Sequence, residues 1–307
     1  MVATSIAPVP LADEVAGFFA HQPRLTASPY GMYRRLREEA PVFRHADMVL
    51  ISRYADAKEV LSLPTTWQGL AAKGSRYRKA EMSLDDRHRE QLAETFGFLE
   101  KRLGGANGAR HSRLRRLAQK AFTPRMIAMM EQRIDEIVQT LLDPLVGRDE
   151  VELIGDFAFH VPLIVISEML DIPTSDRDRL RGWATDLGQF VGADWSSPAN
   201  VESAKRAVFS LREYLTGVFD DRRGGPTTDL LGALIAAEGD GGERFSEDEL
   251  VAMILQFVFA GHETTTNTIG NAMALFLNDE PEQWRMLVED PSLLPNAIEE
   301  VLRFAAP

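Results

Sequence analysis

The chain has 307 residues, with 34 Lys and Arg against 46 Asp and Glu, a formal net charge of −12 and no cysteine. The missing thiol excludes a disulfide scaffold, a cysteine zinc site, a redox dithiol and a cysteine nucleophile. The acidic balance argues against generic binding to nucleic acid or anionic membranes, because both require a basic surface. With no targeting segment at the start of the sequence, we expect a globular protein of the cytoplasm.

The first third of the chain carries clear local signals. Residues 29–40 predict a helix, and residues 41–52 predict two short strands joined at Ala46–Asp47. A second helix is expected over 55–63. Residues 68–95 are polar, charged and weakly periodic, which predicts a long, mobile connection of the kind that often serves as a lid.

Helical patterns dominate the remainder of the chain. The ranges expected to be helical are 109–122, 124–146, 156–171, 175–192, 198–222 and 246–278, followed by two shorter helices that begin near Pro281 and Leu293. Residues 149–155 predict a strand, and residues 224–228 and 238–242 predict loops. Ser246 with Glu249 three residues later forms a capping box for the long helix. The expected fold class is therefore mainly α with a small β part.

The long helix contains a histidine and an acid in a pattern close to that of a zinc site. A zinc peptidase would need His262 and a second histidine at position 266, with Glu263 between them, so that both imidazoles face one metal. Position 266 is Thr266. The zinc interpretation therefore fails at its second ligand.

The same stretch has two other unusual properties. Ala260 and Gly261 remove side chains where a buried helix normally packs large ones, so a flat ligand could approach the backbone. The Thr264 hydroxyl can bond back to the Ala260 carbonyl, and an acid beside a hydroxyl, here Glu263, can relay protons. The alternative is a helix–helix contact through small residues, with Glu263 in solvent.

A second segment places His111 and Arg115 four residues apart, and therefore on one helix face. Together these side chains can grip a carboxylate, which arginine binds bidentately. Residues 110–125 hold six Lys or Arg and no acid. The alternative is an ordinary solvated basic face. A third segment near the end pairs Glu300 with Arg303 on one helix turn, which as a surface pair would contribute less than about 1 kcal/mol.

Taken together, in this order, these segments resemble the bacterial soluble cytochromes P-450, the haem-thiolate monooxygenases. The stretches that carry the resemblance are AGHETT (260–265), HSRLRR (111–116), EEVLR (299–303), PVFRHADMVLIS (41–52) and QKAFTP (119–124). The likeness covers residues 29–307. It implies a single cytochrome P-450 domain over 1–307 that lacks its C-terminal portion, and haem b as the cofactor of the full-length protein.

The resemblance assigns the cofactor contacts residue by residue. His111 and Arg115 match the positions that bind the haem propionates, in agreement with their carboxylate-gripping geometry. Ala260 and Gly261 match the groove of the long helix over the distal face of the haem.

The resemblance also assigns the reacting side of the haem. Glu263 and Thr264 match the acid–alcohol pair that delivers protons during dioxygen activation. Gln256 and Phe259 would face the substrate pocket. The implied reaction is hydroxylation or epoxidation of a small organic substrate.

One part of the family pattern is absent. Glu300 and Arg303 match the ExxR pair, which is structural rather than catalytic, and the resemblance implies a cysteine downstream of it as the iron ligand. The sequence ends at Pro307 without that metal ligand. A thiolate ligand is what makes these haems monooxygenases. We therefore expect the chain to be the N-terminal part of such an enzyme, with weak or no haem binding and exposed apolar surface when alone.

The resemblance implies redox partners as well. Electrons would come from NAD(P)H, and a ferredoxin-type donor would dock on the proximal basic face formed by residues 110–125. Docking of this kind depends on local charge, so the acidic total does not contradict it. Neither nucleic acid nor a membrane is expected as a partner.

Two other hypotheses stay open at this point. The zero cysteine count is compatible with a P-450-like auxiliary protein that supports a partner enzyme such as a glycosyltransferase. An acidic helical ligand-binding protein with no redox role is the second possibility. The intact Glu263–Thr264 pair favours the monooxygenase, because a non-catalytic descendant has little need of it.

Overall fold

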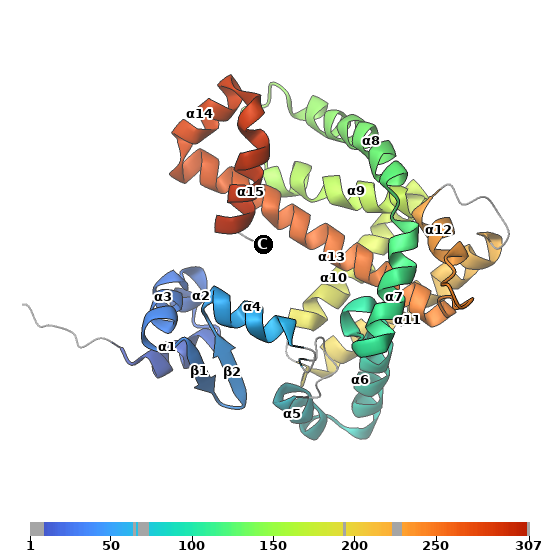
Figure 1. Ribbon diagram of the computed structural model, residues 1–307, viewed down its shortest axis with the longest axis horizontal. Coiled ribbons are helices and arrows are strands. Elements are labelled where there is room, and N and C mark those ends of the chain that lie inside the picture. Colours follow the sequence, from blue (N-terminus) through green and yellow to red (C-terminus); the bar gives the residue numbers. More distant parts are fainter. Residues whose placement is uncertain (1–8, 64–65, 67–73, 193–194, 223–228, 306–307) are drawn as a thin grey trace, which may run out of the picture. The chain divides into compact units, whose positions relative to one another are not determined.

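The computed structural model describes residues 9–63, 66, 74–192, 195–222 and 229–305 (Figure 1). The chain divides into two compact units, residues 1–67 and residues 68–307, which are described separately. The expectation of a single domain stays a prediction.

The first unit combines short helices with a β-hairpin. Its elements are α1 (Leu11–Phe19), α2 (Pro23–Ala27), α3 (Tyr30–Glu39), β1 (Val42–His45), β2 (Met48–Ile51) and α4 (Tyr54–Ser62). The strands pair antiparallel with His45 opposite Met48, so Ala46–Asp47 forms the turn, as predicted. Leu11, Val15, Met32 and Leu36 make a small core of their own.

The second unit is helical in its described residues. Its α-helices are α5 (Ser75–Ser83), α6 (Asp86–Leu99), α7 (Gly108–Ala121), α8 (Pro124–Leu142), α9 (His160–Met169), α10 (Arg177–Gly192), α11 (Pro198–Arg222), α12 (Leu230–Ala236), α13 (Glu247–Ala274), α14 (Pro281–Glu289) and α15 (Leu294–Phe304). Together with the hairpin of the first unit, this confirms the prediction of a mainly α protein with a small β part.

Helix α13 is the central element of the second unit. Its first half is apolar on all sides, which is the pattern of a helix enclosed by others. The buried side chains there are Leu250, Val251, Ala252, Met253, Ile254, Leu255 and Val258. The helix packs against α6, α9, α10, α11 and α15 (Figure 1). The position of α13 therefore sets the position of every side chain in the predicted site on it.

The N-terminus of α13 is fixed by the predicted capping box. The Ser246 hydroxyl accepts the Glu249 N–H at 3.2 Å, and the Glu249 carboxylate accepts the Ser246 N–H at 3.0 Å. Glu249 is only 8% exposed, and Arg113 of α7 donates to it. Burial disfavours its charged form, but the bonds from Ser246 and Arg113 outweigh burial and lower the Glu249 pKa. One carboxylate thus closes the helix end and ties α7 to α13.

The predicted long connection over 68–95 is wrong for the described part, because 75–99 forms α5 and α6. The Asp85 carboxylate caps α6 by accepting the His88 N–H at 2.9 Å. Leu92, Phe96 and Leu99 recur at helical spacing and are buried. The many charged residues between them hide that spacing in the sequence. Residues 68–73 lie outside the described residues.

The predicted strand over 149–155 is also wrong. The Glu152 carboxylate accepts the N–H groups of Ile154 and Gly155, which curls the chain into a turn. A π-helical turn, Ile154–Ala158, follows and leads into α9. The alternating apolar and acidic residues of 149–155 therefore form a turn that the Glu152 side chain caps, not a strand.

The ends of the remaining helices and loops differ from the predicted ends by a few residues. Helix α8 ends at Leu142, and the long helix ends at Ala274 and passes into a π-helical turn, Leu275–Asp279. Residues 238–242 form the predicted loop, whereas the loop expected at 224–228 lies outside the described residues.

Replacing Glu249 by Ala is expected to lower the free energy of unfolding by about 2–3 kcal/mol, because it removes a helix cap and leaves the Arg113 guanidinium without its carboxylate partner. Chemical denaturation measures this. Arg116→Ala is the control, since the exposed Arg116–Glu243 pair should contribute less than about 1 kcal/mol. The Glu249 pKa is lowered from 4.5, so its contribution should be complete above that pH and fade as the pH falls below it. Equal losses in the two variants would contradict the anchoring role.

Candidate functional site

The second half of α13 has two flanks of different character. At about 100° per residue, Phe259, His262, Glu263 and Thr266 lie on one flank. Ala260, Gly261 and Thr264 lie on the other. The predicted acid and alcohol are therefore neighbours in sequence that face different surroundings.

The flank of Ala260, Gly261 and Thr264 is open. All three residues are exposed, and a Cβ added at Gly261 would meet no atom within 4 Å. The Thr264 hydroxyl donates to the Ala260 carbonyl at 2.6 Å, as predicted, and Thr268 donates to the Thr264 carbonyl at 2.8 Å. Because these hydroxyl protons are bonded to the backbone, the oxygen lone pairs face outward as acceptors. This open flank offers backbone access and hydroxyl oxygens to a flat ligand.

The opposite flank faces a cavity of about 330 Å³ between α13, α10 and the segment Ile154–Phe159 that leads into α9. Its lining includes Phe259, His262 and Glu263 of α13 and Gly188 of α10. A Cβ at Gly188 would lie 3.1 Å from the Phe259 ring and 3.8 Å from a Glu263 carboxylate oxygen. The absence of a side chain at Gly188 therefore lets both side chains of α13 lie against α10.

Glu263 and Thr264 make no hydrogen bond with each other in the described part of the chain. The Thr264 hydroxyl is bonded to Ala260, and the Glu263 side chain lines the cavity on the other flank. A proton passing from one to the other must travel around the helix through a mobile carrier such as water.

His262 is bonded across to α9. Its Nε2 lies 3.1 Å from the Phe159 carbonyl oxygen, and the two rings meet edge to face with centroids 4.3 Å apart. Burial lowers the pKa of His262, although the Phe159 carbonyl and the Glu263 charge act in the opposite direction. The imidazole is therefore neutral at pH 7. In the sequence His262 stands out only as a possible zinc ligand, because a contact with a carbonyl 103 positions away leaves no local signal.

Gln256, at the N-terminal end of the predicted site, accepts a hydrogen bond from another segment of the chain. Its Oε1 accepts the Gly104 N–H at 2.7 Å. Gly104 belongs to the 3-10 turn Leu103–Gly105, which precedes α7. The Gln256 amide thus holds this turn against α13.

The basic run on α7 divides into two sets. In the first set, Arg110, Arg113, Arg116 and Lys120 approach acids that follow α12 or begin α13: Glu249, Glu243 and Asp240.

His111 and Arg115 form the second set. Arg113, Arg116 and Lys120 lie on one side of the buried Leu114–Leu117 stripe, and His111 and Arg115 lie on the other. Neither His111 nor Arg115 has a side-chain hydrogen bond or ion pair within the described ranges. These two groups are therefore free to bind an anion, whereas the first set already has partners.

Glu300 and Arg303 form the predicted pair on α15. Arg303 Nε donates to Glu300 at 2.8 Å, and a second bond makes the contact bidentate. This hydrogen bonding lowers the Glu300 pKa. Both side chains are exposed, so the pair is a surface contact in this structure.

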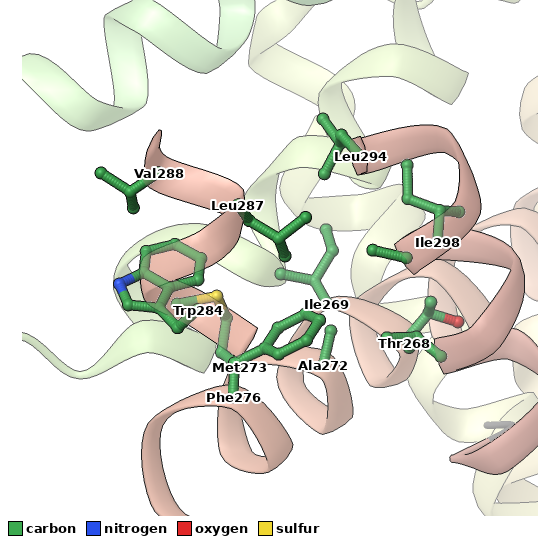
Figure 2. A pocket seen from close by; sticks show the side chains of 12 residues that line it. Thr268, Ile269, Ala272, Met273, Phe276, Trp284, Leu287, Val288, Leu294 and Ile298 are labelled. Carbon is green, nitrogen blue, oxygen red and sulfur yellow. The ribbon is translucent and has the colours of Figure 1, made fainter. Parts of the chain in front are cut away.

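A larger pocket, of about 450 Å³, lies between the end of α13, α14 and α15. Its walls are apolar side chains such as Met273, Phe276, Trp284 and Ile298, with Thr268 as the polar exception (Figure 2). The Thr268 hydroxyl is bonded to its own helix. The pocket therefore lacks groups for acid–base chemistry, and the α13 site is the better candidate.

The described residues contain neither a metal-binding cluster nor a membrane-spanning helix. They contain no cluster of three or more His, Cys, Asp or Glu side chains placed to hold a metal ion. None of the helices described has the length and apolar character needed to cross a membrane.

Comparison with known proteins identifies similar chains. The family described as Cytochrome P450 matches residues 211–306. Cytochrome P450 107B1 of Saccharopolyspora erythraea is 39% identical over 96% of this chain and 70% of its own. Cytochrome P450 monooxygenase PikC of Streptomyces venezuelae is 33% identical over 92% of this chain and 64% of its own. The crystal structure of P450BioI in complex with an acyl carrier protein ligated to hexadec-9Z-enoic acid superposes with a TM-score of 0.77, at 26% identity, over 92% of this chain and 70% of that one.

Gly188→Ala should destabilise the protein by a net amount of about 1 kcal/mol, because the added methyl group would lie 3.1 Å from the Phe259 ring and the resulting overpacking outweighs the gain in helix propensity. Gly182→Ala on the same helix is the matched control, since nothing lies within 4 Å of its added Cβ. That control should stabilise the protein by about 0.5–1 kcal/mol through helix propensity. Denaturant unfolding of both variants measures the difference, and equal effects would contradict the packing of Phe259 against α10.

Proposed function

The chain belongs to the cytochrome P450 family, whose members are haem-dependent monooxygenases, and we propose that its α7 and α13 residues form the haem-facing site of such an enzyme. One observation carries the proposal: among the described residues, His111 and Arg115 of α7 have no side-chain partner while its other cations do, and α13 is open at Gly261. These are the features that a dianionic, flat cofactor requires.

The residues present fit the haem on two counts. The haem propionates would bind to His111 and Arg115 through charge-assisted hydrogen bonds. Its porphyrin face would lie along the open flank of α13, where Ala260 and Gly261 leave room. The third count, a thiolate for the iron, is not met within these 307 residues, which contain no cysteine. When bound through a thiolate, the haem supplies the redox chemistry of oxygen activation.

The proton chemistry is assigned to Glu263 and Thr264. Glu263 lines the cavity beside α10 and is the acid from which protons enter the site. Thr264 holds its own proton on the Ala260 carbonyl, so its Oγ1 can accept a hydrogen bond from the open side. Water moving around the helix would connect the two groups. This arrangement favours general acid catalysis at the open flank.

The substrate is assigned to the class of small organic molecules, which the enzyme would hydroxylate or epoxidise. Phe259 supplies an apolar wall beside Glu263. Gln256 acts on the substrate side by holding the turn that contains Gly104. Glu300 and Arg303 retain a structural role, which their bidentate contact supports.

The electron supply is assigned to NAD(P)H through a ferredoxin-type donor that docks on the basic face of α7. The internal pairing of Arg110, Arg113, Arg116 and Lys120 lowers the net positive charge of this face. Electrostatic steering of an acidic donor should therefore be modest and sensitive to salt. The cytoplasm, which holds the reduced nicotinamide cofactors, is the corresponding location.

Arg115→Ala and His111→Ala should each weaken haem binding about 10- to 100-fold, because each removes a hydrogen bond to a charged group. Absorbance titration of the haem-free, full-length protein, which supplies the thiolate ligand, measures the dissociation constant. Arg116→Ala is the matched control, since its side chain contacts Glu243 and should leave haem affinity unchanged. Equal weakening in Arg115→Ala and Arg116→Ala would contradict the division of the two sets.

Thr264→Ala should uncouple electron consumption from product formation in the haem-loaded, full-length enzyme, because the acceptor oxygen on the open flank is lost. Thr264→Ser retains that oxygen and should retain most of the coupling. The ratio of product formed to NAD(P)H consumed is the measurement. Full coupling in Thr264→Ala would rule out the relay.

A further inference from the structure

We propose that His262 is a positioning residue, which holds the part of α13 that carries Glu263 and Thr264 against the start of α9. The catalytic consequence of this role depends on the proposed function. Its structural basis, the contact between His262 and Phe159, is independent of that function.

The partner of His262 determines its tautomer. A backbone carbonyl can only accept, so the proton must sit on Nε2, 3.1 Å from the Phe159 oxygen. The edge-to-face contact with the Phe159 ring fixes the plane of the imidazole. With both its hydrogen bond and its ring plane set, His262 holds a single rotamer between the two helices.

The need for such a contact follows from the surroundings of the open flank. The continuous buried stretch of α13 ends at Leu255, and Ala260, Gly261 and Thr264 are exposed and carry only small side chains. The hydroxyls of Thr264, Thr265, Thr266 and Thr268 all bond to carbonyls of α13 itself.

Between Gln256 and Asn271, His262 therefore makes the side-chain hydrogen bond that joins α13 to another described element. Gln256 holds the helix at one end through Gly104, and Asn271 holds it at the other through the Ala305 carbonyl. The contact of His262 lies near the middle, beside the reacting residues. Without it, the helix could rotate and shift the two flanks relative to α9 and α10.

The position in the chain explains how one residue serves both flanks. Glu263 follows His262 directly and lines the same cavity. Thr264 is two residues on, about 200° around the helix. A rotation of α13 would therefore move the acid away from the cavity and the hydroxyl away from the open flank together.

Amide hydrogen exchange of the 307-residue protein tests the contact without haem. His262→Leu removes the donor at similar size, and exchange of amides 261–266 should rise about five-fold, as expected for the loss of one hydrogen bond. His262→Gln places an amide N–H at similar reach and should restore the wild-type rate. Asn267→Leu is the matched control, because Asn267 lines the same cavity but its side chain makes no hydrogen bond in the described part of the chain. Unchanged exchange in His262→Leu, or an equal rise in Asn267→Leu, would overturn the proposal.

Nitrogen NMR of the unmodified protein tests the same contact without any substitution. The His262 ring should show a protonated Nε2 and an unprotonated Nδ1. A protonated Nδ1 with a bare Nε2 would exclude the bond to Phe159.

The consequence for catalysis is tested by the coupling ratio of the haem-loaded, full-length enzyme. His262→Leu should lower this ratio and His262→Gln should restore it. Intact coupling in His262→Leu, beside lost coupling in Thr264→Ala, would overturn the positioning role and leave the proposed function standing. Intact coupling in both variants would overturn the proton relay, and the catalytic role of His262 with it.

Discussion

The carboxylate of Glu249 is the group on which the arrangement of the second unit depends. It closes the capping box at the start of α13 and accepts the guanidinium of Arg113 on α7. Since Glu249 is almost fully buried, its charge is stable only while both partners remain in place. The contact therefore sets the position of α7 relative to the start of α13, and through it the two elements to which we assign the haem.

A single principle then accounts for both halves of the site: each helix uses one face for packing and leaves another free. On α7, the cations that hold acids lie on one side of the buried stripe, and His111 and Arg115 lie on the other. On α13, the flank of Phe259 and Glu263 lies against the cavity beside α10, whereas the flank of Gly261 is open. Our assignment of the site therefore rests on side chains that lack partners among the described residues.

Local signals predicted those parts of the structure that local forces determine. The hairpin turn at Ala46–Asp47 and the capping box of Ser246 are set by residues within a few positions of each other, and both are confirmed. The helix α6 was missed because charged residues surround the Leu92–Phe96–Leu99 spacing, and its burial depends on partners far away in sequence. The strand expected at 149–155 failed because the Glu152 side chain bonds to the backbone ahead of it. The His262 contact depends on a carbonyl 103 positions away and leaves no local signal.

The most direct test is a crystal structure of the haem-loaded, full-length protein. We predict propionate oxygens within hydrogen-bonding distance of His111 and Arg115, with the porphyrin along the flank of Gly261 and Thr264. The salt bridge between Glu249 and Arg113 should be unchanged in that structure. Propionates bound by Arg116 or Lys120, or a porphyrin on the Phe259 flank, would contradict this prediction.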